Sequence, residues 1–168
     1  MCTNPVSGGI KYDDFYVFNS LGGSLNSLIG SDSRIVTKMP NAPGFYTNWT
    51  PNGLGANWQN VSQQPASAVD FNANNVAGTK DSYAMQTAGI LAAPLFFVVR
   101  ASLEKDDAGT HTPGIFVRSG SSDAAGIATA ALGATYLYYD TLITNDPATG
   151  QPWGGGGADA AQAGIIEG

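Results

Sequence analysis

The sequence predicts an all-β protein, an antiparallel β-sandwich of jelly-roll type with at most one short helix near the C-terminus. Three observations indicate this class. The 168 residues include 22 glycines, short segments rich in β-branched and aromatic residues alternate with turn-forming residues, and long helical periodicity is absent. Because 43% of the residues are hydrophobic, we expect one core in a single domain over residues 1–168, with residues 1–10 as a loose lead-in.

The N-terminal half contains two predicted strands and a long loop. Aromatic and β-branched residues predict a strand over Lys11–Asn19, and alternation of apolar and polar residues predicts a second over Arg34–Pro40. The segment that follows is rich in Pro, Gly and Asn and is expected to be a loop. A turn is expected at Ala77–Gly78, with a short strand after it.

The strongest strand signal is "PLFFVVRASLEK", which starts at Pro94. Side chains alternate between the two faces of a strand. This alternation places one set of residues on one face (Leu95, Phe97, Val99, Ala101, Leu103) and a second set on the other (Phe96, Val98, Arg100, Ser102). "PGIFVRSG" reads as a return strand, so residues 101–118 are expected to form a hairpin with a long loop.

The C-terminal third has a strand, a short helix and a closing strand. The strand is expected within Thr135–Ile143. "ADAAQAG" has helix propensity over about two turns. "GIIE" is expected to be the last strand.

Composition argues against several functional classes. The net charge is −6, and the seven Lys and Arg residues are scattered, so no nucleic-acid partner is expected. The longest apolar stretch is about 12 residues and contains Pro94, which is too short to span a membrane. The N-terminus shows no signal-peptide pattern. With one cysteine, Cys2, and one histidine, no metal or other cofactor is expected.

No catalytic motif is complete, so we do not expect an enzyme and assign no catalytic residue. His111 lies in a loop without a "GxSxG" nucleophile elbow. A glycosidase needs two opposed carboxylates, and neither adjacent pair, Asp13-Asp14 or Asp106-Asp107, is specific for that arrangement. The run "GGGG" at 154–157 is followed by Ala158-Asp159, not by the Lys-Ser/Thr of a phosphate-binding loop. We expect this run to be an exposed, flexible connection that binds nothing.

Three tryptophans leave two interpretations open. Trp49, Trp58 and Trp153 lie in segments rich in Gly, Asn and Pro. Exposed rings beside Asn or Gln would suit a carbohydrate-binding, lectin-like surface, and a glycan is therefore a possible ligand. The alternative is that the rings anchor loops at the ends of the sandwich.

The order of several motifs resembles the structural proteins of tailed bacteriophages. The motifs are "YDDFYVFNSLGGSLNSLIGSDSRIVTKMPNAPGFYTNWTPNGLGANWQNV", "VAGTKDSY", "KDDAGTHTPGIFVRSGSSDAAG" and "YLYYDTLITNDPATGQPW", and they extend from Tyr12 to Trp153. The resemblance implies a virion component with a jelly-roll or concanavalin-like sandwich and no catalytic residues. After "PW" the family pattern has a short helix, whose first turn the four glycines replace.

From this resemblance we expect a virion protein, made in the host bacterial cytoplasm, that decorates the head or belongs to the tail. Its partners would be major capsid or tail proteins and further copies of itself. Tyr136, Tyr138 and Tyr139 are candidate interface residues, because tyrosine combines apolar area with a hydroxyl group. Ordinary cross-strand packing is the alternative for these three. The second functional hypothesis is a carbohydrate-binding module that recognises the host surface.

Overall fold

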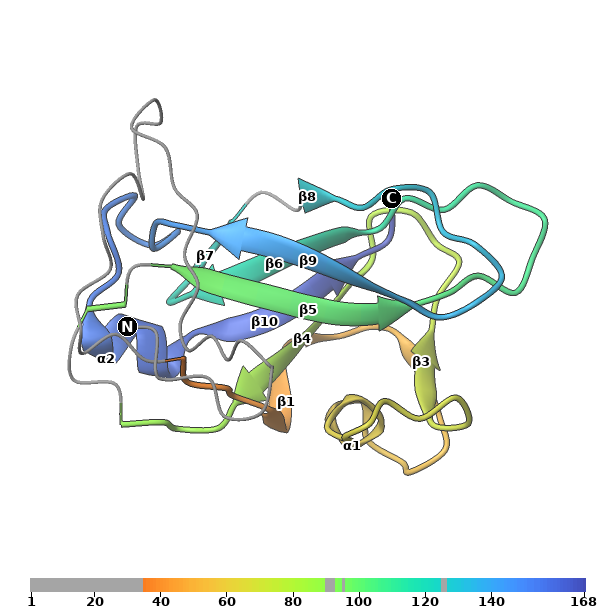
Figure 1. Cartoon of the computed structure of the whole chain (residues 1–168), viewed down its shortest axis with the longest axis horizontal. Coiled ribbons are helices and arrows are strands. Elements are labelled where there is room, and N and C mark those ends of the chain that lie inside the picture. Colours follow the sequence, from red (N-terminus) through yellow and green to blue (C-terminus); the bar gives the residue numbers. More distant parts are fainter. Residues whose placement is uncertain (1–34, 90–92, 95, 125–126) are drawn as a thin grey trace, which may run out of the picture. The chain divides into compact units, whose positions relative to one another are not determined.

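Antiparallel strands make up most of the regular structure (Figure 1). The structure is a computed structural model that describes residues 35–89, 93–94, 96–124 and 127–168, and Val36–Gly168 form one compact unit. Its elements are β1 Pro40–Thr47, β2 Thr50–Asn52, α1 Asn57–Val61, β3 Phe71–Ala73, β4 Lys80–Met85, β5 Phe97–Leu103, β6 Gly114–Ser119, β7 Ser122–Asp123, β8 Ile127–Ala128, β9 Leu137–Ile143, α2 Gly155–Ala160 and β10 Gln162–Ile166. The predicted all-β class is confirmed.

The larger sheet has six strands in the order β1-β4-β10-β6-β7, with β8 also paired to β6. The C-terminal strand β10 is central, because it pairs with β4 on one side and β6 on the other. The closing strand predicted at "GIIE" is therefore confirmed, although it begins earlier, at Gln162. Every residue of β6 is buried, as expected for a strand with neighbours on both edges and both faces covered.

A second layer consists of β5 and β9, which pair antiparallel and cross the larger sheet in Figure 1. The predicted alternation is confirmed over residues 97–100, where Phe97 and Val99 are partly buried and Val98 and Arg100 are exposed. It does not extend further, because Phe96 and residues 101–103 are all partly buried, and Leu95 lies outside the described residues. An apolar cluster lies between the layers, and Phe97 and Val99 of β5 pack against it. The buried members of this cluster are Val117, Ile143, Trp153, Ala158 and Ala161. Burying such side chains is the main force that holds two sheets together.

Two predicted features of the strands are wrong. Residues 101–118 do not form a hairpin, because β5 pairs with β9 and β6 pairs with β10, so the connection between β5 and β6 passes from one layer to the other. The strand expected over Arg34–Pro40 instead begins at Pro40 and continues through the Pro- and Gly-containing segment. Proline is tolerated there because β1 is at the edge of its sheet. The strand predicted at Lys11–Asn19 lies outside the described residues.

The four glycines also differ from expectation. Gly155, Gly156 and Gly157 form the first turn of α2 and not a flexible connection. The buried Ala158 packs this helix against the core, and the Lys38 ammonium donates hydrogen bonds to the carbonyls of Ala158 and Asp159 at its C-terminal end. A cation at a helix C-terminus is favourable, so packing and this cap offset the poor helix propensity of glycine. The short helix α1 was not expected.

Candidate interaction surface

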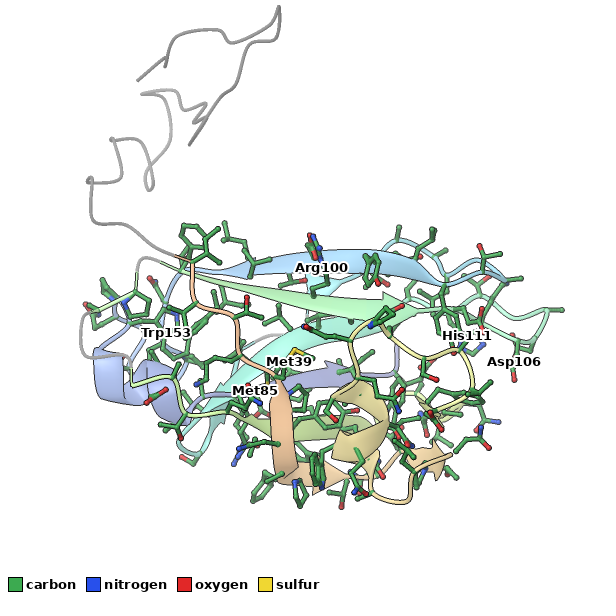
Figure 2. All side chains as sticks on the ribbon, turned by 60° about the horizontal axis from the view of Figure 1, so that its bottom comes forward. Met39, Met85, Arg100, Asp106, His111 and Trp153 are labelled. Carbon is green, nitrogen blue, oxygen red and sulfur yellow. The ribbon has the colours of Figure 1, made fainter. Side chains whose placement is uncertain are left out.

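The outward side of the β5–β9 layer carries a set of exposed side chains. We call it the outer β5–β9 face and define it by Val98, Arg100, Tyr138, Asp140 and Leu142. The exposed fractions are 53% for Val98, 47% for Leu142 and 62% for Tyr138. In Figure 2, Arg100 points from its strand away from the larger sheet. This face therefore offers apolar, aromatic and charged groups to solvent.

Strand register fixes the arrangement of this face. Val98 lies opposite Leu142, Arg100 opposite Asp140, and Ser102 opposite Tyr138. Directly opposed residues on one face are close enough to interact. The result is three successive rows across the two strands: an apolar row, a charged row and a row with tyrosine.

The charged row is a bidentate ion pair. Arg100 Nε lies 2.7 Å from Asp140 Oδ1, and Arg100 Nη2 lies 2.6 Å from Asp140 Oδ2. The hydrogen bonds from Arg100 are the main reason that the pKa of Asp140 lies below its ordinary value. The guanidinium also lies 5.5 Å from the centre of the Tyr138 ring, within cation–π range. The parallel hydrogen bonds hold the two charges in one orientation.

The structure separates the three tyrosines that the sequence singles out. Tyr138 belongs to the outer β5–β9 face, whereas Tyr139 pairs with Ala101 on the opposite side of the strand and is half-buried. Tyr136 precedes β9 and is also half-buried. Burial is the largest cause of the raised pKa of Tyr136, and the charge of Glu104 adds to it. Only Tyr138 presents most of its side chain to solvent.

The tryptophans do not form a common surface. Trp153 is 1% exposed and lies in the core, where its ring meets Phe97 edge-to-face at 4.6 Å between centroids. The exposure that sugar stacking requires is therefore absent at Trp153. Trp49 and Trp58 are half-buried, and Trp49 Nε1 donates to the Thr79 carbonyl at 3.3 Å. For this tryptophan, the loop-anchoring interpretation agrees with the structure.

A second exposed aromatic group lies on the outer side of the larger sheet, at residues that the sequence analysis does not single out. The Phe45 ring is 66% exposed and covers the Arg118 guanidinium at 4.0 Å. Arg118, Lys80 and Tyr46 all donate to the carboxylate of Asp123, at 2.6, 2.7 and 2.8 Å. Burial alone would raise the pKa of Asp123, but these hydrogen bonds outweigh it and the pKa is lowered. The members come from four strands, so only the topology reveals the cluster.

Both ring nitrogens of His111 lie within hydrogen-bond distance of acidic side chains. His111 Nδ1 lies 2.6 Å from Glu167 Oε1, and Nε2 lies 3.0 Å from Asp107 Oδ1. Both ring nitrogens therefore face carboxylate oxygens. Within the described ranges no group of three His, Cys, Asp or Glu side chains is arranged to hold a metal ion. No helix in the described part of the chain is long and apolar enough to cross a membrane.

The outer β5–β9 face thus presents exposed apolar side chains together with tyrosine and arginine, residue types that are enriched at protein interfaces. The paired charges, the apolar row and the exposed ring lie on two adjacent strands, which gives them a fixed spacing. Comparisons of this chain with protein-family models, with curated protein sequences and with solved structures find no match.

Proposed function

We propose that this protein is a structural component of a bacteriophage virion, in the head as decoration or in the tail, and that it docks on neighbouring virion proteins through the outer β5–β9 face. The observation that carries the proposal is this face, which exposes Val98, Leu142 and Tyr138 around a fixed ion pair. The order of motifs from Tyr12 to Trp153 supports the choice of a virion.

The charge balance of the face favours protein docking. Arg100 and Asp140 neutralise each other, in a chain whose net charge is −6. A charge that is already paired loses less hydration energy on docking than an isolated charge does. Burial of the flanking apolar side chains on docking contributes a favourable free energy of about 25 cal/mol per Å² of apolar surface. Such a face suits a module that repeats on a lattice.

The test is the copy number of the protein in purified particles, measured by quantitative mass spectrometry. Hundreds of copies would indicate a shell protein, and about six or twelve would indicate the tail or collar. Leu142→Asp should lower the copy number by about tenfold or more, because it places a charge in the apolar row. Val76→Asp is the matched control, since Val76 is exposed to a similar degree, 56% against 47% for Leu142, but lies outside the face. Absence of the wild-type chain from particles would contradict the proposal.

A glycan array run in parallel addresses the carbohydrate-binding hypothesis. The virion proposal expects no glycan signal that depends on the tryptophans. The lectin-like function would be favoured by two results together: a glycan signal that Trp49→Ala or Trp58→Ala removes, and absence of the wild-type chain from particles.

A further inference from the structure

We propose that the outer β5–β9 face binds a second copy of this chain in a two-fold symmetric, face-to-face pair. This inference rests on the proposed function and deepens it, because it names one of the proteins that the face receives. It follows from the cross-strand register of β5 and β9 together with the chemistry of each row.

Consider a two-fold axis that runs parallel to the strands, outside the molecule above the outer β5–β9 face, and over the line midway between β5 and β9. Rotation about this axis places β5 of one copy over β9 of the other without any shift along the strands. Each residue then lies over the residue that opposes it within its own sheet. The register therefore sets Val98 against the partner's Leu142 and Arg100 against the partner's Asp140.

Every row is complementary to itself under this operation. The apolar row meets an apolar row, and the exposed fractions of Val98 and Leu142 leave about half of each side chain to be covered. In the charged row, each guanidinium lies over a carboxylate of the other copy, so the four charges alternate in sign. In the third row, Ser102 lies against the partner's Tyr138, which pairs a small side chain with a large one. Two sheets stacked in this way are about 10 Å apart, a distance that such side chains can fill.

The charges of the chain and of the outer β5–β9 face favour a second copy as the occupant. Two copies with a net charge of −6 each repel one another over most orientations. The outer β5–β9 face adds no net charge to this repulsion, since its one positive and one negative group cancel, and in the pair each of them lies over its opposite in the other copy. A nucleic acid or an anionic membrane surface would instead select a positively charged face.

Charge reversal tests the pairing on the full-length chain, by sedimentation velocity and light scattering. The wild type should be a dimer. Arg100→Asp and Asp140→Arg should each weaken the dimer by at least about tenfold, because like charges then meet both within and between copies. The double variant R100D/D140R should dimerise again, since it restores opposite charges at both places. Circular dichroism and thermal unfolding check that each variant folds, and Val76→Asp should leave the dimer unchanged.

Mixing separates pairing between copies from the ion pair within one copy. The double variant and the wild type each keep an intact ion pair within one copy. In a mixed pair, however, Arg100 of the wild type would lie over the arginine that the double variant carries at position 140. Tagged wild type should therefore capture untagged wild type but at least about tenfold less of the double variant. A monomeric wild type, a dimer that tolerates both single reversals, or free mixing of the two forms would overturn the proposal.

The outcome is distinguishable from failure of the proposed function. A chain that is monomeric in solution but present in particles keeps the virion function and loses the pairing. A chain that dimerises as described but is absent from particles keeps the pairing and loses the virion function.

Discussion

Nδ1 of His111 lies 2.6 Å from Oε1 of Glu167, although the two residues are 56 positions apart. His111 belongs to the connection between β5 and β6, and Glu167 follows the central strand β10. The Glu167 side chain is only 5% exposed, and its backbone N–H donates to the Thr79 carbonyl. The imidazole therefore ties the interlayer connection to the end of the main sheet.

This contact predicts a loss of stability as the solution becomes more alkaline. The hydrogen bond to Glu167, followed by that to Asp107, raises the pKa of His111 above its ordinary value of 6.5. The stabilisation is therefore complete below pH 6.5 and is lost as the pH rises through the raised pKa. The melting temperature should fall over that range, as measured by circular dichroism. His111→Gln should remove most of this dependence. A variant that kept the full slope would assign it to other groups.

The fold could be predicted where the signal is local. Alternation in β5 gives its two faces, because pleating makes successive side chains point in opposite directions. The partner of β6 could not be predicted in this way. A turn signal shows that the chain reverses, but pairing with β10 or with β5 depends on burial of residues distant in sequence, such as Val117 against Trp153.

The candidate site was predictable only in part. Residue type selects Tyr138, and the two-residue period of a strand could have separated it from Tyr139. The pairing of Arg100 with Asp140 requires the register of β9 against β5, which a single sequence does not contain. The cluster around Asp123 could not be predicted from local patterns, because the hydrogen bond between Tyr46 and Asp123 joins residues 77 positions apart.

Asp81 should be replaceable by asparagine at no cost in stability. Its side chain is fully buried, Oδ2 accepts hydrogen bonds from Asn57 and Tyr83, and Oδ1 has no partner among the described residues. Burial raises the pKa of Asp81 despite these hydrogen bonds, so the charged form opposes folding as the pH rises above 3.8. Asp81→Asn keeps one acceptor oxygen and should gain about 1 kcal/mol at neutral pH.

Urea unfolding of Asp81→Asn at neutral and acidic pH checks this expectation. The gain over the wild type should shrink as the pH falls towards and below 3.8, because the carboxyl of the wild type then becomes neutral in both states. Asp81→Ala serves as the comparison, because it leaves Asn57 and Tyr83 without their acceptor and should cost about 1–3 kcal/mol. An asparagine variant that is less stable than the wild type at neutral pH would show that the charge itself is needed.

Trp153 should be the tryptophan on which stability depends most. Its ring contacts Phe97 of the second layer and packs with Val117 of the larger sheet, so it joins the two layers. Trp153→Ala should lower the free energy of unfolding by about 3–5 kcal/mol through lost burial and the cavity left behind. Trp58→Phe is the control and should cost less, since Trp58 is half-buried. Urea unfolding followed by circular dichroism gives both values, and equal losses would contradict this role of Trp153.

Two glycine-to-alanine substitutions should have opposite signs. At Gly164 in the central strand, an added Cβ would overlap the ring of the buried Phe116, so Gly164→Ala should cost about 1–3 kcal/mol. At Gly156 in α2, a Cβ meets nothing within 4 Å, and the backbone is already helical. Gly156→Ala should therefore stabilise the protein by about 0.5–1 kcal/mol, because alanine loses less backbone entropy in a helix. Phe116→Leu in the Gly164→Ala background should recover part of the loss, since it removes the overlapping ring atoms. Chemical unfolding of the three variants measures these differences, and a loss at Gly156 would mean that the glycine run is not helical in solution.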